Sequence, residues 1–520
     1  MKTGKKLGLL LLVLCLLLPL PVEASGETET FIVGMEVNYA PFNWSQTTDA
    51  DGAVPVENSP GEYANGYDVW MAKRLAEGLG KTLVIRKIEW DGLPPALTSG
   101  KIDAIIAGMS PTPERKKEVD FTEQYYASDL VMVVRKDGKY ANAKALADFR
   151  GAKITGQLNT FHYEVIDQIE GVAKQAPLDT FSTMITALNA GSIDGYVSER
   201  PGALAAVMAN PNLAMVVFAP GKGFVADPEN TTIAVGVRKG DALKEQINHI
   251  LAEIPEEERQ QAMDAMVTLQ NRGESGSTSF LDEVRAIWDT YSSLFLRGTG
   301  VTLLISFLGT AFGLGIGFVV QVIRTIPTKK KRGVNKVLIR LLQLLGTAYV
   351  EVFRSTPMIV QAMLIFYGSK QFFHVDMDPL FAACLIVSIN TGAYLAETIR
   401  GGIDSVDVGQ FEAARAIGLG HGQMMIHVIL PQAMRAILPS IGNELVVNIK
   451  DTSVLNVISV TELFFVTKSV AGSTFQIFQA YFIVALIYFV LTRLANFIIR
   501  TLSRKFSPDV PFTIKSATEA

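Results

Sequence analysis

The sequence predicts two folded parts in series, an α/β domain at the front and an all-α membrane domain of five helical spans behind it. Three observations lead to this prediction. Short β-rich runs alternate with helical patterns from residue 31 to about residue 269, and uncharged apolar stretches recur after residue 298. The charge also changes sign: residues 26–292 carry 24 Lys and Arg against 38 Asp and Glu, whereas residues 293–520 carry 20 against 12. Basic residues spread over an apolar region disfavour a nucleic-acid binder, whose charges would gather on one soluble face.

Residues 1–25 have the pattern of a secretory signal peptide. Three lysines form the charged head, an apolar stretch follows from Leu7 to Leu20, and small residues around Ala24 form a cleavage site. An uncleaved anchor helix is the alternative, and both place residue 30 onward outside the cell. After cleavage Cys384 is the one cysteine left, so no intrachain disulfide is expected.

The front domain shows regular alternation of elements. Strands are expected at residues 31–35, 82–86, 103–107, 130–134 and 233–237, and a helix at residues 67–79 with Gly80 ending it. This order predicts an α/β fold with mostly parallel sheets. Residues 46–64, rich in Asp, Gly, Pro and Asn, are expected to form a loop or hairpin insertion, and residues 272–279 a flexible linker.

The rear domain has the composition of a membrane protein. Residues 298–323 hold no charge, and 26 residues of helix suffice to cross a hydrocarbon core of roughly 30 Å. Further spans are expected near residues 356–373, 379–399, 436–459 and 475–499. The basic run Lys329–Arg332 and the basic C-terminal tail indicate cytoplasmic segments, because Lys and Arg are enriched there. Five crossings that start outside then end inside.

Several motifs follow one another along the front domain: Tyr39-Ala-Pro-Phe42, Gly66-Tyr-Asp-Val69, Trp90-Asp-Gly-Leu-Pro-Pro-Ala-Leu97, Gly100-Lys-Ile-Asp-Ala104, Gly108-Met-Ser-Pro-Thr-Pro-Glu-Arg115 and Asp120-Phe-Thr-Glu-Gln-Tyr-Tyr126. In this order and spacing, residues 31–270 resemble the polar amino-acid binding proteins of bacterial ABC importers. The resemblance implies a type II periplasmic-binding-protein clamshell of two α/β lobes within residues 26–272. Lobe 1 would comprise about 31–127 and 234–270, and lobe 2 about 130–226, with crossovers near 125–129 and 226–233.

The resemblance also implies how the charged ends of a free amino acid would be held. Arg115 would bind the carboxylate, since a guanidinium can do so bidentately. Ser110 and the backbone N–H groups around Gly108 would add donors. Glu199 would bind the ammonium group, at a position where the family usually has aspartate. The alternatives are a solvated helix start for Arg115 and a surface charge for Glu199.

Three further residues complete the expected site. Thr160 matches a second-lobe hydroxyl of the family, although Asn159 stands where the family often has glycine. Tyr39 and Tyr67 would sandwich the aliphatic or cationic part of the ligand, with plain core packing as the alternative for both. Glu36 stands where the family often has an acid that faces the ligand side chain. The substrate implied is therefore arginine, lysine, histidine or glutamine, and a solvated Glu36 is the alternative.

The rear domain carries a second set of motifs: Tyr349-Val-Glu-Val-Phe-Arg-Ser-Thr-Pro357, Gly392-Ala-Tyr-Leu-Ala-Glu-Thr-Ile-Arg-Gly-Gly402, Glu412-Ala-Ala-Arg-Ala-Ile-Gly418 and Gly442-Asn-Glu-Leu445. From about residue 299 to 506 it resembles the permease subunits of polar amino-acid importers. The resemblance implies a linker at 273–292, a transmembrane domain at 293–506 and a cytoplasmic tail at 507–520.

The third of these motifs matches the signature that seats a short helix in a groove of the ATPase subunit. Glu412 would begin the helix and favour its positive end. Ala413, Ala414 and Ala416 would form a small-residue face, and Gly418 would turn the chain. Glu397 in another motif is a candidate contact for a cationic substrate in the pore, because charges in a membrane span are costly. A structural ion pair and a position at the membrane face are the alternatives.

No Gly-x4-Gly-Lys-Ser/Thr phosphate loop occurs in the sequence, so we expect no enzyme activity and a separate ATPase subunit as partner. The five histidines form no metal-spaced cluster, and no cofactor or metal is expected. One permease unit per chain implies a homodimer around the pore, or pairing with a different permease chain. A ligand-gated channel of the glutamate-receptor type and a chemosensory receptor are competing interpretations; the first lacks a Thr-Val-Gly-Tyr-Gly filter, and the second lacks a signalling domain after residue 506.

Overall fold

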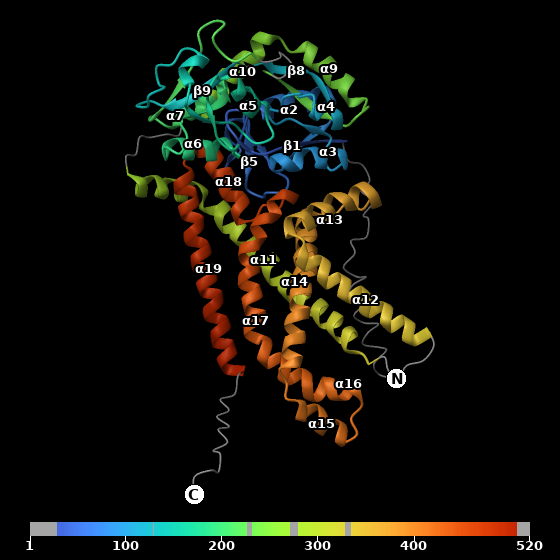
Figure 1. Cartoon of the computed structure of the whole chain (residues 1–520). Helices are drawn as coiled ribbons and strands as arrows, with labels where there is room; N and C mark the ends of the chain where they lie inside the picture. The colour runs from blue at the N-terminus through green and yellow to red at the C-terminus, as the bar shows by residue number, and fades with distance from the viewer. Residues whose placement is uncertain (1–28, 128, 226–230, 271–278, 328–333, 507–520) are drawn as a thin grey trace.

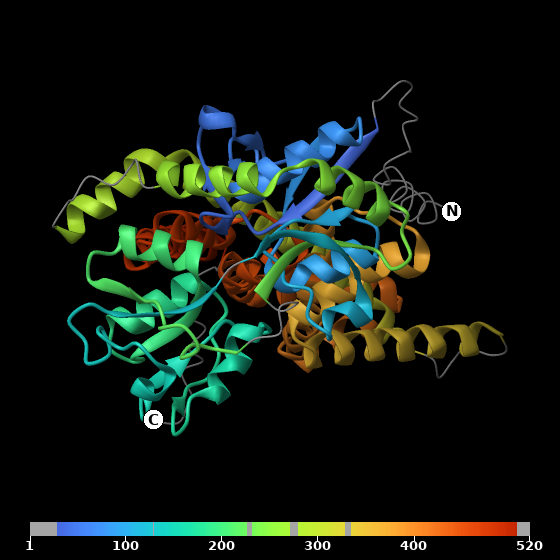
Figure 2. The ribbon, with the colours of Figure 1, turned by 90° about the horizontal axis from the view of Figure 1, so that it is seen from above.

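The computed structural model describes residues 29–127, 129–225, 231–270, 279–327 and 334–506. The expected signal peptide, the basic run Lys329–Arg332 and the C-terminal tail lie outside these residues. An α/β domain of two lobes sits on one end of a helical domain (Figure 1). Seen from above, the two lobes lie side by side over the helices (Figure 2).

Lobe 1 is built on a five-stranded sheet in the order β6-β1-β7-β14-β8. Its strands are β1 (Thr30–Met35), β6 (Thr82–Lys87), β7 (Ala104–Ile105), β8 (Asp120–Ala127) and β14 (Thr232–Val237). The helices of this lobe are α2 (Tyr67–Gly78), α3 (Leu93–Thr98), α4 (Arg115–Glu118), α9 (Leu243–Glu253) and α10 (Glu256–Gln270). Helix α2 ends as predicted, since Gly80 adopts a left-handed conformation with φ +66° just beyond it.

Lobe 2 repeats this plan with a sheet in the order β11-β10-β12-β9-β13. Its strands are β9 (Leu130–Arg135), β10 (Lys153–Thr155), β11 (Ala173–Lys174), β12 (Gly195–Glu199) and β13 (Leu213–Val216). The helices are α5 (Phe161–Glu164), α6 (Phe181–Asn189) and α7 (Arg200–Ala209).

The prediction of mostly parallel sheets is wrong, because both sheets are mixed. In lobe 1, β1 is parallel to β6 and β7, whereas β14 is antiparallel to β7 and β8. In lobe 2, β10 is parallel to β11 and β12, whereas β9 is antiparallel to β12 and β13. β9 and β14 are the first strands formed after the chain crosses from the other lobe. Each is antiparallel to both of its neighbours in the sheet.

The chain passes between the lobes twice. It leaves lobe 1 at the end of β8, Ala127, and enters lobe 2 at the start of β9, Leu130. It returns between the end of β13 and the start of β14, and residues 226–230 of that return lie outside the described residues. The expected insertion at 46–64 is a hairpin: β2 (Asn38–Tyr39), β3 (Asn43–Gln46), β4 (Val54–Pro55) and β5 (Tyr63–Asn65) form a small antiparallel sheet in the order β2-β3-β5-β4.

Among its described residues the rear domain consists of helices joined by short loops and contains no strand. Its helices are α11 (Phe280–Thr325), α12 (Val334–Ser355), α13 (Met358–Phe373), α14 (Pro379–Asp404), α15 (Val408–Ala416), α16 (His421–Met424), α17 (Leu430–Asp451), α18 (Leu463–Thr474) and α19 (Ile477–Phe506). Four helices among the described residues are long and apolar enough to cross a membrane: Phe280–Thr325, Pro379–Asp404, His421–Ile458 and Ile477–Ser503. The fifth expected span corresponds to α13, which has only 16 residues.

The boundary between the two domains differs from the expected linker. Residues 280–292 form the first turns of α11 rather than a linker, and residues 271–278 lie outside the described residues. The apolar pattern starts only at residue 298, so it marks the part of α11 suited to lipid and misses the helical part before it. The α/β domain and the α15–α16 segment lie at opposite ends of the helical domain (Figure 1).

Candidate functional site

A small cavity lies between the two lobes. It has a volume of about 20 Å³, which is room for about one water molecule. Its lining residues come from both lobes: Glu36, Asn38, Tyr39, Trp90, Gly108, Ser110, Arg115, Gln157, Thr160, Phe161, His162, Thr180 and Phe181. Hydrogen bonds from Tyr39 to Glu199 and from Asn159 to Asp91 join the lobes, so the lobes must move apart before a molecule as large as an amino acid can occupy this cavity.

Arg115 begins α4 and bridges the two lobes. Its Nη1 donates to the backbone oxygen of Ser110 at 2.8 Å, and its Nη2 donates to the backbone oxygen of Asn159 in lobe 2 at 2.9 Å. The guanidinium stacks on Trp90, 5.0 Å from the ring centroid. Burial lowers the pKa of Arg115 to about 10, while the Glu199 carboxylate acts in the opposite direction. The guanidinium therefore stays charged at neutral pH, and its two bonds leave other donors of its five N–H groups for an anion.

Glu199 ends strand β12 on the opposite lobe and is almost fully buried. Its Oε2 accepts a hydrogen bond of 2.9 Å from the hydroxyl of Tyr39, and its Oε1 lies 3.4 Å from Nε2 of His162. That imidazole nitrogen has no hydrogen-bond partner among the described residues. Burial, together with Glu199, raises the pKa of Tyr39, so the phenol remains a donor. Arg115 lines the cavity itself, whereas Glu199 is not among the lining residues and contacts two of them, Tyr39 and His162.

The two tyrosines of the expected sandwich have different positions. Tyr39 lines the cavity and stacks between Phe42, at 5.1 Å between ring centroids, and Phe181 of lobe 2, at 4.8 Å. Tyr67 is fully buried in the core of lobe 1, and its hydroxyl donates to the backbone oxygen of Tyr125 at 2.9 Å. The structure does not bring Tyr67 to the cavity, and the core-packing alternative describes its surroundings.

A buried network of hydrogen bonds in lobe 1 supports the segment around Tyr39. The hydroxyl of Tyr125 donates to Oδ1 of Asp68 at 2.6 Å, and the amide of Asn43 donates to Oδ2 of the same carboxylate at 2.8 Å. Burial raises the pKa of Asp68 to about 6, although both hydrogen bonds oppose this shift. The backbone N–H of Gly108 donates to the Tyr125 hydroxyl at 3.2 Å. Gly108 has φ +63°, and a Cβ there would lie 3.0 Å from the Tyr39 ring, so glycine is required.

The loop of lobe 2 that faces Arg115 is held by its own side chains. The Thr160 hydroxyl donates to the backbone oxygen of Gln157 at 2.8 Å. Asn159 has φ +58°, a left-handed conformation that asparagine tolerates better than most residues. This substitution for the family's glycine therefore keeps the backbone shape, and its amide donates to Asp91 of lobe 1 at 3.2 Å.

Glu36 occupies the acidic end of the cavity. Its side chain is buried, and burial together with the neighbouring Glu89 raises its pKa to about 8. Asp91 acts in the same direction, whereas Lys468 of the helical domain acts in the opposite direction. The solvated alternative for Glu36 does not describe these surroundings.

Sequence reasoning did not single out several residues that line the cavity, above all Trp90, Gln157, His162 and Phe181. Trp90 stands in a recognised motif, and His162 follows Thr160 by two residues, so local position could have suggested both. No pattern around Phe181 signals a ligand, because its ring reaches Tyr39 only once the lobes have closed.

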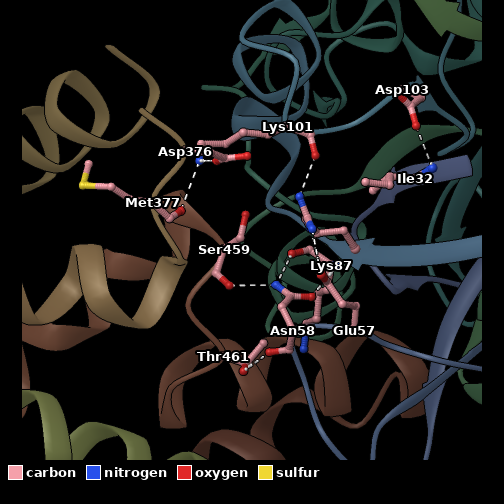
Figure 3. A network of polar contacts seen from close by, with 11 residues as sticks. Ile32, Glu57, Asn58, Lys87, Lys101, Asp103, Asp376, Met377, Ser459 and Thr461 are labelled. Carbon is pink, nitrogen blue, oxygen red and sulfur yellow. Dashed lines mark hydrogen bonds and ion pairs between the residues drawn. The ribbon is translucent and has the colours of Figure 1, made fainter. Parts of the chain in front are cut away.

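A network of polar contacts joins lobe 1 to the helical domain (Figure 3). The amide of Asn58 donates to the backbone oxygens of Lys87 and Ser459, at 2.9 and 2.8 Å, and Thr461 donates to the backbone oxygen of Asn58 at 2.7 Å. Lys101, 4% exposed, pairs with Asp376 at 2.7 Å and lies 3.8 Å from the centroid of the Phe366 ring. A buried cation that finds both partners across the boundary indicates a specific interface.

At the other end of the helical domain lies the expected coupling segment. Helix α15 starts at Val408, and the side chain of Asp407 caps it by accepting from the backbone of Gly409 at 2.7 Å. The expectation that Glu412 begins this helix is therefore wrong, because the capping residue Asp407 stands five residues before Glu412.

The small-residue face also differs from the expectation. Ala414 is 2% exposed and packs on the helical domain, whereas Glu412, Ala413 and Ala416 are exposed. The three alanines therefore do not share one free face. Gly418 turns the chain with φ +81°.

Glu397 lies on α14 and is paired with two arginines. Its Oε1 lies 2.6 Å from Arg324 on α11, and its Oε2 lies 2.8 Å from Arg400 on its own helix. These contacts favour the structural ion pair over a role as substrate contact.

Comparisons with known proteins agree with both parts. Residues 31–266 match the bacterial extracellular solute-binding proteins, family 3, and residues 338–508 match the binding-protein-dependent transport system inner membrane component. The glutamine transport system permease protein GlnP of Escherichia coli K12 is 36% identical over 221 residues, which are 42% of this chain and 95% of GlnP. The arginine transport system permease protein ArtQ of Bacillus subtilis is 33% identical over 214 residues, 41% of this chain and 93% of ArtQ.

Among solved structures, the substrate-binding protein AbpA of Streptococcus pneumoniae, bound to L-arginine, aligns with 46% of this chain and 94% of its own, with 23% identity and a TM-score of 0.39. The permease relatives are covered almost in full, and the solute-binding match precedes them on the same polypeptide. The chain therefore belongs to the amino-acid ABC importer family, as a fusion of a family 3 solute-binding domain to an inner-membrane permease domain.

Proposed function

We propose that the chain captures a polar amino acid between its two lobes and passes it across the membrane through its own permease domain. One observation carries the proposal: Arg115 of lobe 1 lines the cavity and bonds across to lobe 2, while Glu199 of lobe 2 contacts two of the lining residues, Tyr39 and His162. A free α-amino acid carries the matching carboxylate and ammonium groups. Tyr39 would cover the aliphatic part, and Nε2 of His162, which makes no hydrogen bond among the described residues, would gain one from the ligand.

The substrate class follows from the acidic end of the cavity. A carboxylate at Glu36, with Glu89 and Asp91 nearby, suits the side chain of arginine, lysine or histidine, and a neutral Glu36 suits glutamine. The names of the permease relatives, glutamine transport and arginine transport, agree with this range.

The energy source would be a separate ATPase subunit that binds at α15. The exposed Glu412, with Ala413 beside it, lies on the free side of that helix, and Ile417 is 75% exposed just after it. An apolar side chain at the outer end of a domain fits a site that a partner covers. Two chains would pair through their permease domains around the pore, because each chain supplies one permease unit.

The proposed orientation places the α/β domain (26–272) outside the cell, after a signal peptide (1–25), and α15 with the tail (507–520) in the cytoplasm. The opposite positions of the α/β domain and α15 support it (Figure 1). In a Cys384→Ala background, a cysteine at Met208 should react in whole cells with an impermeant thiol reagent, and a cysteine at Ile417 should not. Labelling at Ile417 from outside would reverse the orientation.

The function itself is tested by calorimetry of the full chain in lipid nanodiscs against the twenty amino acids. We expect saturable binding of at least one of glutamine, arginine, lysine and histidine. Absence of binding by all twenty amino acids would refute the proposal. The purified chain should also show no ATP hydrolysis until the ATPase subunit is added.

A further inference from the structure

Helix α18 of the permease domain rests directly on the hairpin that carries Tyr39. The backbone N–H of Ser45 donates to the hydroxyl of Ser473 at 2.8 Å, in a buried position. A Cβ on Gly472 would lie 2.3 Å from the backbone oxygen of Asn38, so only glycine permits this approach. Asn38 itself lines the cavity between the lobes. The permease therefore reaches the wall of the ligand site.

The side chain of Lys468 extends from α18 into the solute-binding domain. Its Nζ lies 2.8 Å from Oε2 of Glu89, and the two side chains are only 12% and 11% exposed. The amide of Asn456, also from the permease domain, approaches the other oxygen of Glu89 at 3.4 Å. Glu89 directly precedes Trp90, a lining residue of the cavity. This is a nearly buried ion pair between the two domains.

Lys468 also acts on the acidic end of the cavity. Its positive charge opposes the rise in the pKa of Glu36, whereas Glu89 and Asp91 promote it. The cation of Lys468 and the carboxylates of Glu36, Glu89 and Asp91 therefore form one electrostatic group. The side-chain cation of arginine or lysine, held in the proposed way, would join this same group.

A second, larger cavity adjoins the site on the side of Lys468. It has a volume of about 320 Å³ and lies between lobe 2 and helices α18 and α19. Asn38 and Thr180 line both cavities, and Lys468 and Tyr481 form part of the permease wall of the larger one. The place where Lys468 meets Glu89 is thus next to a chamber large enough for an amino acid.

We propose that Lys468 is a specificity-determining residue that the permease domain supplies to the substrate site. In the docked chain it competes with the cationic side chain of a substrate for Glu89 and Glu36, so docking selectively weakens the binding of cationic amino acids and favours their transfer to the adjoining chamber. This inference rests on the proposed function of the cleft. Its physical basis is repulsion between two like charges in a site with little water, where a nearby charge acts more strongly than at a surface.

The test is calorimetry of the full chain in lipid nanodiscs at pH 8 with arginine and with glutamine. The variant Lys468→Gln removes the competing charge and keeps a side chain of similar length. Its dissociation constant for arginine should fall by on the order of tenfold or more, whereas that for glutamine should change by less than about twofold. Lys468→Arg retains the charge and should preserve the wild-type ratio of the two constants.

A second variant makes the test independent of how well Lys468→Gln folds. Glu89→Gln leaves Lys468 without its acid, so arginine should weaken by a larger factor than glutamine. In the double variant the gain of Lys468→Gln should shrink, because the two residues act on one ligand charge. Equal changes for arginine and glutamine in both single variants would overturn the proposal, as would loss of arginine binding in Lys468→Gln while glutamine still binds.

Failure of this inference can be told apart from failure of the proposed function. If Arg115→Ala abolishes the binding of both amino acids while Lys468→Gln has no selective effect, the cleft is the substrate site and only the role of Lys468 is refuted. If neither arginine nor glutamine responds to Arg115→Ala, the proposed function of the cleft is refuted as well.

Discussion

Replacement of Arg115 by alanine should weaken the binding of every amino acid by a similar factor. The side chain is assigned to the carboxylate, a group that all α-amino acids share. Its loss leaves that charge without a partner in a site with little water, which typically costs about 2–5 kcal/mol. This corresponds to roughly 30-fold to several-thousand-fold in affinity. The bond to Asn159 of lobe 2 adds a contribution to lobe closure that is also independent of the ligand.

The assay is calorimetry of the full chain in nanodiscs with glutamine, arginine, lysine and histidine. Arg238→Ala is the matched control, because Arg238 bonds the backbone oxygen of Ile102 and pairs with Asp241 but does not line the cavity. The control should bind all four ligands as the wild type does. Unchanged binding in Arg115→Ala would mean that the ligand carboxylate binds elsewhere. An altered ranking of the ligands would show that Arg115 recognises the ligand side chain.

Three further predictions concern charge, coupling and docking. Arginine binding should strengthen from pH 6 to pH 8, by up to about tenfold per unit, because Glu36 has a pKa of about 8 and must ionise to pair with a cation. The affinity for glutamine should not change over this pH range, and Glu36→Gln should remove the pH dependence of arginine binding. The same raised pKa makes Glu36 lower the free energy of unfolding as pH rises from about 4.5 to 8, which urea titrations of wild type and Glu36→Gln would detect. With the cognate ATPase, Glu412→Lys should abolish transport in proteoliposomes while ligand binding persists; continued transport would contradict the coupling role. Asp376→Ala should leave the buried Lys101 without its carboxylate and increase hydrogen exchange in residues 374–379, and equal exchange would mean that the pair does not secure docking.

Much of the fold could be predicted because its signals are local. The strands of lobe 1 and lobe 2 are short β-rich runs, and Gly80 marks the end of α2 through a backbone conformation that glycine favours. Strand direction could not be predicted, since β9 and β14 enter each sheet from the opposite lobe and no local pattern records that.

The same distinction between local and distant signals applies to the residues of the candidate site. Arg115, Ser110 and Gly108 belong to one short segment, so their approach to the cavity follows from a single turn of chain. The position of Tyr67 depends on which side of the lobe 1 sheet its ring packs against, and the aromatic pattern alone does not decide this. The pair of Glu89 and Lys468 joins residues 379 positions apart on two domains, and neither residue stands in a pattern that points to the other.

The short connection between the two domains has a consequence for the physiology of uptake. Helix α10 ends at Gln270 and helix α11 begins at Phe280, so ten peptide units, at most about 35 Å of chain, join receptor and pore. A connection of this length keeps the local concentration of the solute-binding domain at its own permease domain in the millimolar range, whatever the level of expression. The ratio of receptors to permease units is one by construction. Each permease unit therefore has a solute-binding domain close by, and the rate of uptake should follow the occupancy of that domain.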